Sequence, residues 1–364
     1  MTPPCPPAYP ASRHTAAIAT GMRIPLRLRL PHIALGALIM IATTAAMAER
    51  PVVIAHRGAS GYLPEHTLES KAYAHALGVD YLEQDVVLSR DGVPVVLHDL
   101  WLDDVTDVRQ VFPGRQREDG RFYVIDFSLA ELRQLAVHER RNAQGDQRWP
   151  ARFAASGLPL RIPTLAEELA FIQALNRSTG REVGVYTEIK SPAWHRAAGM
   201  DASRAVLAVL SAAGYSRRGD NAYLQCFDPA ELRRIRVELG SDLKLVQLIG
   251  DDAWGEAETD YAAMRSAVGL AAVAGYADAI GAWLRHLLEP STDGTRVVST
   301  GLAQAAHEAG LDVHGYTFRR DELPPEIPDA QAMHGLLFGV AAIDGLFSDH
   351  PDVTLEYLAA DPTM

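Results

Sequence analysis

The sequence predicts an α/β protein built on a (β/α)8 (TIM) barrel, with a long insertion after the third strand-like segment. Strand-like and helical segments alternate over most of the chain, which is typical of a parallel sheet. About eight strands in such a length suit a closed barrel better than an open, doubly wound sheet. The open sheet is the alternative, but the segment His56-Arg57-Gly58-Ala59-Ser60-Gly61 has neither dinucleotide-binding spacing nor a P-loop lysine.

The first 48 residues have the pattern of a secretory signal. Three arginines from Arg23 to Arg29 precede an apolar run from Ile33 to Ala46, and Ala46-Met47-Ala48 is a small-x-small cleavage site. The apolar run is shorter than the ~20 residues of a membrane span, so no membrane anchor is expected. Met22 is the expected start, and residues 49–364 are expected to form the exported barrel domain.

The net charge limits the possible binding partners, and the cysteine content predicts one buried thiol. Loss of residues 1–48 removes four arginines and no acidic residue, which changes the formal net charge from −12 to −16. So acidic a protein is a poor candidate for binding nucleic acid or anionic membranes. It can still bind a small anion where Arg57, a lysine and a metal concentrate positive charge. Cys226, the cysteine left after cleavage, lies in an apolar run and is expected to be buried.

Chemistry-bearing residues cluster in the first part of the barrel domain. Strands are expected at 52–55, 81–88 and 93–98, a helix at 67–77, and a hairpin turn at Asp91-Gly92. Glu83 and Asp85 alternate along one strand, so both side chains face the same way. His56 and His98 stand at strand ends, and Arg57 follows the first of them. Together these residues are typical of a metal-assisted phosphoryl-transfer site.

An irregular segment then runs from about residue 100 to 163. It contains several Pro and Gly turn signals and one expected helix at 129–135. We expect an insertion that covers one end of the barrel, because loops of this length are usually functional. Its apolar residues lack the periodicity needed for a core of their own, so an independent domain is not expected.

Regular alternation resumes after the insertion. Strands are expected at 183–189, 222–227, 243–249, 279–282, 313–318 and 345–347, and helices at 165–175, 203–213, 230–239, 261–273, 301–309 and 330–338, with a terminal helix. Glu188 and Lys190 fall two residues apart at the end of the first of these strands. In a barrel, catalytic groups lie at the carboxyl ends of the strands. Glu188 is therefore expected to meet Glu83 and Asp85 at the barrel mouth.

Three converging carboxylates would repel one another without a cation. Oxygen ligands of this kind suit Ca²⁺ or Mg²⁺, and the histidines lack the spacing of a zinc motif. If Glu83 and Asp85 are considered alone, surface salt bridges are a reasonable alternative to a metal site. The presence of Glu188, Lys190 and the histidines at neighbouring strand ends disfavours that alternative.

At these residues the sequence resembles the glycerophosphodiester phosphodiesterases, and most of all the bacterial periplasmic members of that family. The matching segments are His56-Arg57-Gly58, Pro64-Glu65-His66-Thr67, Glu83-Gln84-Asp85, Val96-Leu97-His98-Asp99, Glu188-Ile189-Lys190, Tyr223-Leu224-Gln225-Cys226-Phe227 and Gly345-Leu346-Phe347-Ser348-Asp349. The likeness extends from Pro51 to the C-terminus. The family departs from this chain at Thr187 and Gly315, where it has proline, and over Ala282 to His286, which form a wall of the expected leaving-group pocket.

The resemblance implies metal-dependent hydrolysis of small glycerophosphodiesters to glycerol 3-phosphate and an alcohol, in the periplasm, as part of glycerol and phospholipid-headgroup catabolism. The ion implied is Ca²⁺, with Mg²⁺ as the alternative. The implied roles are metal ligation by Glu83, Asp85 and Glu188, acid/base catalysis by His56 and His98, and substrate binding by Arg57, Lys190, Glu65, Phe227 and Tyr316.

Several alternatives stay open at this point. The attacking group is either water or the glycerol hydroxyl of the substrate, acting through a cyclic phosphate. A lipid phosphodiesterase on the same barrel would need an apolar rim, whereas the insertion is polar. A binding protein that lost its chemistry should lack a reacting group, and none is missing. The sequence does not distinguish a monomer from a homodimer.

Overall fold

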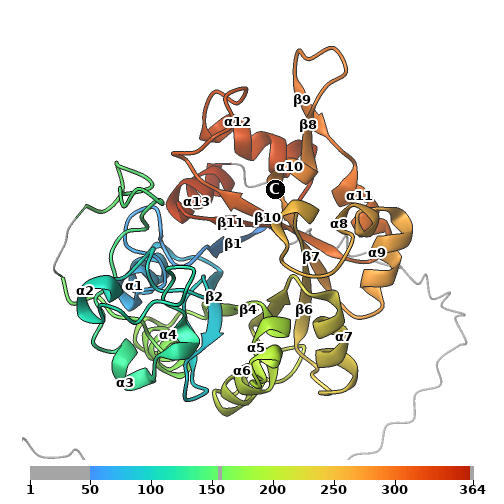
Figure 1. Ribbon diagram of the computed structural model, residues 1–364. Coiled ribbons are helices and arrows are strands. Elements are labelled where there is room, and N and C mark those ends of the chain that lie inside the picture. The colour runs from blue at the N-terminus through green and yellow to red at the C-terminus, as the bar shows by residue number, and fades with distance from the viewer. Residues whose placement is uncertain (1–49, 155–157, 361–364) are drawn as a thin grey trace, which may run out of the picture. The chain divides into compact units, whose positions relative to one another are not determined.

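The computed structural model describes residues 50–154 and 158–360, so the predicted secretory signal lies outside the described residues. Within this part of the chain, eight parallel strands close into a barrel (Figure 1). In order around the barrel, the strands are β1 (Val52–Ala55), β11 (Gly345–Ser348), β10 (Asp312–Phe318), β7 (Ala279–Trp283), β6 (Lys244–Ile249), β5 (Ala222–Cys226), β4 (Gly184–Ile189) and β2 (Tyr81–Leu88). Pairing of β1 with β2 closes the ring.

Helices surround this barrel (Figure 1). The longer ones are α1 (Leu68–Leu77), α4 (Leu165–Thr179), α6 (Ala202–Ala212), α7 (Pro229–Val237), α9 (Ala267–Ala274), α11 (Leu302–Glu308) and α13 (Pro351–Ala360). The shorter ones are α5 (Pro192–Ala197), α8 (Tyr261–Met264), α10 (Leu284–Leu287) and α12 (Ala330–His334), which runs into a π-helical turn over Gly335–Val340. A hairpin of β8 (Leu288–Pro290) and β9 (Val297–Ser299) projects from the barrel. None of the helices in the described ranges is long and apolar enough to cross a membrane.

The helix starts follow from local capping chemistry. The Thr67 hydroxyl accepts a hydrogen bond from the Ser70 amide at the start of α1. Thr164 and Glu167 form a reciprocal capping box at the start of α4. Such caps satisfy amides that a helix start leaves without partners, and each contributes about 1 kcal/mol. They fix where α1 and α4 begin, and so where the loops that carry the site end.

The third expected strand is not part of the barrel. Strand β3 (Pro94–Val96) is shorter than predicted and pairs antiparallel with the far end of β2, with Val86 opposite Val96. The turn at Asp91-Gly92 reverses the chain there, as predicted, so β3 lies outside the parallel ring. The other eight expected strands, β7 among them, form the barrel.

The insertion has a hydrophobic core of its own, so the expectation that it lacks one is wrong. Apolar side chains on its turns, on α2 (Val108–Val111), on the short 3-10 helix at Val124–Asp126 and on α3 (Leu129–Leu132) bury a second cluster together with Val87, Val95 and Leu97 of the β2–β3 hairpin. Phe122, Phe127 and Leu135 are examples of its fully or nearly fully buried members. The apolar residues are spaced irregularly because they sit on turns and short helices, which carry no helical or strand period.

Aromatic rings fill the barrel interior beneath the strand ends. Tyr186 and Tyr223 stack with their ring centroids 4.7 Å apart. The Tyr186 hydroxyl lies 2.7 Å from His314 Nδ1. These fully packed side chains form a floor that closes the barrel below its carboxyl end. Cys226 is buried in the neighbouring core, as predicted, and burial raises its thiol pKa.

Candidate active site

A cavity of about 240 Å³ opens at the carboxyl ends of the barrel strands. It is lined by His56, Arg57, Glu83, Asp85, His98, Glu188, Lys190, Gln225, Phe227, Leu248, Trp254, Glu256, Trp283, Tyr316, Thr317, Arg319 and Phe347. The structure therefore brings nine of the ten sequence-predicted site residues to one cavity. Glu65, the tenth, lies behind Arg57 and is not among the described residues that line it.

The loop after β1 presents Arg57 to the cavity in an unusual backbone conformation. Arg57 has φ +58° and Gly58 has φ +89°. A Cβ atom at position 58 would come within 2.5 Å of Ser70 Oγ, so only glycine fits there. This turn aims the Arg57 amide at Glu83, whose Oε2 accepts its hydrogen bond at 2.6 Å. The backbone of the His-Arg-Gly motif thus holds one of the predicted metal-binding carboxylates.

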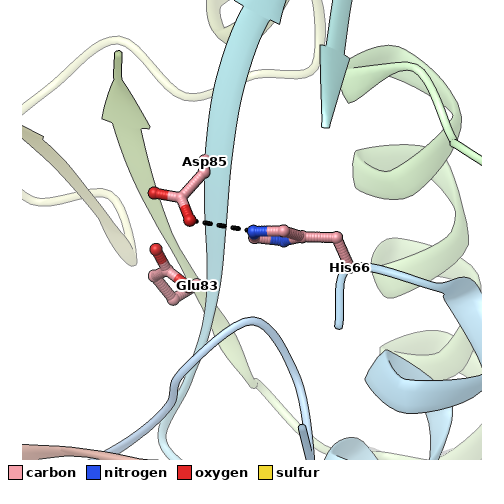
Figure 2. Close-up of side chains that lie close together, drawn as sticks. All are labelled: His66, Glu83 and Asp85. Atoms are coloured by element: carbon pink, nitrogen blue, oxygen red, sulfur yellow. Dashed lines mark hydrogen bonds and ion pairs between the residues drawn. The ribbon is translucent and has the colours of Figure 1, made fainter. Parts of the chain in front are cut away.

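Carboxylates from two adjacent strands meet at the cavity. The β2–β4 register places Asp85 directly beside Glu188, and Glu83 lies one inward-facing position earlier on β2. His66, from the loop before α1, points at the same group, and its Nε2 lies 2.9 Å from Asp85 Oδ2 (Figure 2). Ligand atoms of His66, Glu83 and Asp85 all lie within 4.8 Å of one another. The sequence signal for His66 was weak, because one histidine beside a helix start has many possible roles.

The electrostatics of this cluster call for a cation. Burial raises the pKa of Glu83 and of Glu188 well above the usual range, and the charge on Asp85 adds to the effect at both. The Oδ1 atom of Asp85 is buried and makes no hydrogen bond to any described residue. An unpartnered carboxylate oxygen amid two further carboxylates is a fitting environment for a divalent cation with oxygen ligands. The donor set of this chain therefore fits a metal ion.

Each of the two candidate acid/base histidines is oriented by a carboxylate. His56 Nδ1 lies 2.6 Å from Asp349 Oδ1, and His98 Nδ1 lies 2.7 Å from Asp99 Oδ1. These contacts leave Nε2 of each ring as the nitrogen that can face the cavity. His98 Nε2 lies 3.4 Å from Lys190 Nζ, which suits a neutral imidazole accepting from an ammonium. Burial and then the nearby Arg57 lower the pKa of both histidines to about 4.

Two arginines of the insertion hold the outer oxygens of those carboxylates. Arg152 Nη2 donates to Asp349 Oδ2 at 2.9 Å, and Arg140 Nη1 donates to Asp99 Oδ2 at 2.6 Å. Both arginine side chains are at least nine-tenths buried. No described residue of the insertion lines the cavity. The insertion therefore does not cover the site as expected, but buttresses both histidines from behind.

Glu65 and Lys190 differ in how they meet the site. Glu65 accepts from Arg140 at 2.6 and 2.9 Å and from Arg57 at 3.0 Å, so it fixes the Arg57 guanidinium. Lys190 Nζ lies 2.8 Å from Glu188 Oε1, inside the cavity. Burial opposes the charge on Lys190, but Glu188 and Asp85 outweigh it and raise the pKa of the lysine. Arg57 and Lys190 are thus both cationic and both exposed to whatever the cavity binds.

The other side of the cavity is aromatic. Phe227 and Tyr316, both predicted, pack edge to face with centroids 6.1 Å apart. Trp254 and Trp283, which follow β6 and end β7, pack with centroids 5.0 Å apart. Sequence reasoning placed Trp283 in the wall of the expected leaving-group pocket and gave Trp254 no role, so the structure adds Trp254. Periodicity gives no signal for Trp254, because it ends a single-turn 3-10 helix at Asp252–Trp254 that is too short to carry a period.

The arrangement suits displacement at an anionic phosphorus. Cationic groups neutralise non-bridging oxygens, and two imidazoles that line the cavity can take up and release protons. The aromatic side leaves room for a group attached to the phosphate.

Comparisons with known proteins agree with this geometry. Residues 56–353 match the model of the glycerophosphoryl diester phosphodiesterase family. The chain is 42% identical over 325 residues to the glycerophosphodiester phosphodiesterase of Haemophilus influenzae, covering 84% of this chain and 89% of the relative. It is 36% identical over 338 residues to that of Treponema pallidum, covering 88% and 95%. A crystal structure of a putative glycerophosphoryl diester phosphodiesterase from Silicibacter pomeroyi superposes with TM-score 0.63 at 26% identity, covering 86% and 94%. One of an Oleispira antarctica phosphodiesterase in complex with the product sn-glycerol-3-phosphate superposes at 0.57 with 20% identity, covering 85% and 97%.

Proposed function

Since the chain belongs to the glycerophosphoryl diester phosphodiesterase family, we propose that it hydrolyses glycerophosphodiesters to glycerol 3-phosphate and an alcohol with a divalent cation and two histidines. It is an enzyme of the phosphoric diester hydrolase class. The observation that carries the proposal is the single cavity in which both histidines, two cations and the carboxylate cluster face one another. The sn-glycerol-3-phosphate bound to the Oleispira phosphodiesterase supports small substrates of this kind.

We propose Ca²⁺ as the ion, with Mg²⁺ as the alternative. Glu83, Asp85 and Glu188 would hold it, and His66 either joins them or keeps Asp85 oriented. When bound, the ion supplies Lewis-acid stabilisation of the charge that develops on the phosphoryl oxygens. All-oxygen carboxylate ligands favour these hard cations over zinc.

The protein's own side chains bind the phosphate and transfer the protons. Arg57 and Lys190 bind the non-bridging phosphate oxygens and place the phosphorus between the histidines. One histidine accepts the proton of the attacking hydroxyl at Nε2, and the other donates a proton to the leaving oxygen. A bound phosphodiester anion favours the protonated form of the donor, because an opposite charge raises a histidine pKa. Asp349 and Asp99 hold the rings in the tautomer that this exchange requires.

The place of action is proposed from the sequence. Residues 1–48 have the pattern of a cleaved secretory signal, which favours export to the periplasm. There the enzyme would release glycerol 3-phosphate from phospholipid headgroup diesters for catabolism.

The test is an activity panel with several glycerophosphodiesters, measured as glycerol 3-phosphate release before and after EDTA and with Ca²⁺ or Mg²⁺ added back. Turnover should vanish with EDTA and return with the metal. His56→Ala and His98→Ala should lose turnover but keep metal binding, whereas Glu83→Ala should lose both. Normal turnover in His98→Ala would sink the acid/base assignment.

A further inference from the structure

Arg319 is a cation of the cavity to which the reaction as proposed assigns no role. It follows β10, whereas His56 follows β1 and Lys190 follows β4. In the ring, β10 lies two strands from β1 in one direction and β4 lies two strands from β1 in the other. Burial and then the charge of Arg57 lower the pKa of His56, and the charge of Arg319 lowers it further. Arg319 therefore acts on the same space as His56, from the side opposite to Lys190.

The Arg319 guanidinium is held in place on two sides. Its Nε donates to Asp349 Oδ2 at 2.9 Å, and its Cζ lies 5.6 Å from the centroid of the Trp149 ring. Arg152 donates to the same oxygen of Asp349, also at 2.9 Å, but it is not among the described residues that line the cavity. A buried arginine of the insertion thus already holds Asp349. Holding that carboxylate does not explain a second arginine inside the cavity.

The terminal nitrogens of Arg319 are open to a ligand. The bond from Nε is the only hydrogen bond that its side chain makes to a described residue. Nη1 lies 3.6 Å from Oε2 of Glu322, whose side chain is 46% exposed, and an exposed ion pair of this kind contributes little. The Arg319 side chain is itself 24% exposed. A guanidinium anchored at one edge, with its other nitrogens open, is preorganised to bind an oxyanion.

The chemistry of the reaction gives such a group an oxygen to bind. Hydrolysis breaks one P–O ester bond and adds a hydroxyl to phosphorus, so the product phosphate has three terminal oxygens where the diester had two. The product also carries one more negative charge than the diester. Arg57 and Lys190 match the two non-bridging oxygens of the diester, and a third cation matches the oxygen and the charge that the reaction adds.

We infer that Arg319 is a further substrate-binding residue, which contacts a phosphate oxygen on the His56 side of the cavity. This inference rests on the proposed function and adds a residue to its phosphate site. The contact is made through the terminal nitrogens of Arg319, while its Nε stays on Asp349.

The experiment measures the affinity of the enzyme for glycerol 3-phosphate by isothermal titration calorimetry with Ca²⁺ present, alongside kcat for a glycerophosphodiester. Arg319→Gln should weaken binding of glycerol 3-phosphate by roughly 10- to 150-fold, because a hydrogen bond to a charged group contributes ~1.5–3 kcal/mol. Arg319→Lys keeps the charge but not the planar fork of donors, so it should recover part of the loss. Near-ultraviolet circular dichroism checks that each variant is folded.

Two matched controls separate the contact from other effects of the substitution. Arg152→Gln removes the other hydrogen bond to Asp349 Oδ2 but no group that lines the cavity, so it should lower kcat and keep product affinity within about threefold. Where Arg152→Gln does not fold, Arg152→Lys takes its place. Arg320→Gln makes the same change of charge one residue away, at an exposed side chain over the Tyr62 ring, and should keep both values within about twofold.

The outcomes distinguish this inference from the proposed function. Unchanged product affinity in Arg319→Gln, or no product binding by the parent, would overturn the contact. An equal loss of affinity in the Arg152 variant would overturn it too, because Arg319 would then act only through Asp349. These results leave the proposed function intact where the parent hydrolyses diesters. A parent without diester hydrolysis, in which only the Arg319 variants lose affinity for glycerol 3-phosphate, would instead reject the proposed function and keep the phosphate contact.

Discussion

Replacement of Asp349 by asparagine is the most direct test of how the fold sets the chemistry of His56. Asp349 Oδ1 faces His56 Nδ1, whereas Oδ2 accepts from Arg152 and Arg319, each at 2.9 Å. Burial opposes the charge on Asp349, but Arg319 and His56 hold its pKa well below the usual range. The aspartate is therefore ionised at any working pH and accepts from all three neighbours.

The two arginines decide how an asparagine would sit. If its amide nitrogen faced them, two charge-assisted hydrogen bonds worth ~1.5–3 kcal/mol each would be lost. The carbonyl oxygen must therefore face the arginines, which turns the NH₂ group toward His56 Nδ1. That nitrogen must then accept, so the proton moves to Nε2, the nitrogen that faces the cavity. In a comparable histidine–aspartate pair this switch lowers kcat by about 10⁴.

We accordingly expect Asp349→Asn to lower kcat by about 10³- to 10⁴-fold, or ~4–5.5 kcal/mol of transition-state stabilisation. The assay is glycerol 3-phosphate release under saturating substrate, with ¹⁵N chemical shifts of the His56 ring to identify its tautomer. Asp352→Asn, three residues later, is the matched control because Asp352 bonds the Tyr62 hydroxyl outside the cavity, and its kcat should stay within about twofold. A kcat within tenfold of the parent, or a His56 ring still protonated at Nδ1, would refute the reasoning.

Three further predictions concern stability. Lys71→Met should lower the free energy of unfolding, measured by urea titration, by about 3–5 kcal/mol. The substitution leaves Glu168 buried without its ion-pair partner, because Lys71 Nζ lies 2.7 Å from Glu168 Oε1. The double variant Lys71→Met, Glu168→Leu should recover most of this loss. The contribution of His314 and His334 to stability should be complete above pH 6.5 and should fall between pH 6.5 and 4, because burial lowers the pKa of both to about 4 and the unfolded chain takes up protons in that range. Each histidine contributes up to ~1.4 kcal/mol per pH unit, and His314→Gln should flatten the slope of the free energy of unfolding against pH. Ca²⁺ at about 100 times its Kd should add ~2.7 kcal/mol in thermal unfolding, and Glu83→Ala should abolish that gain.

Much of the site was predictable because short motifs carry local geometry. Strand alternation alone places Glu83 and Asp85 on one face, and Glu188 and Lys190 likewise. All four side chains line the same cavity, as expected. The buried state of Cys226 followed from the apolar run around it. These are properties of neighbours in the chain, which a period of two residues determines.

Contacts between residues that lie far apart in the sequence could not be predicted from the sequence. Arg152 meets Asp349 across 197 residues, and Arg140 meets Glu65 across 75. A buried arginine in an irregular segment has the same sequence signature as an exposed one. Which carboxylate it bonds depends on how the insertion core packs against the β2–β3 hairpin.

Local periodicity and spacing were enough to predict the alternation of strands and helices, the barrel class and the order of polar groups at the strand ends. Three features depend on the tertiary structure. Strand β3 lies outside the barrel, the insertion holds the carboxylates behind both histidines, and Trp254 and Trp283 line the same cavity as Arg57 and Lys190. Ring closure brings β6 and β7 opposite β1, and that juxtaposition exists only once the sheet has closed.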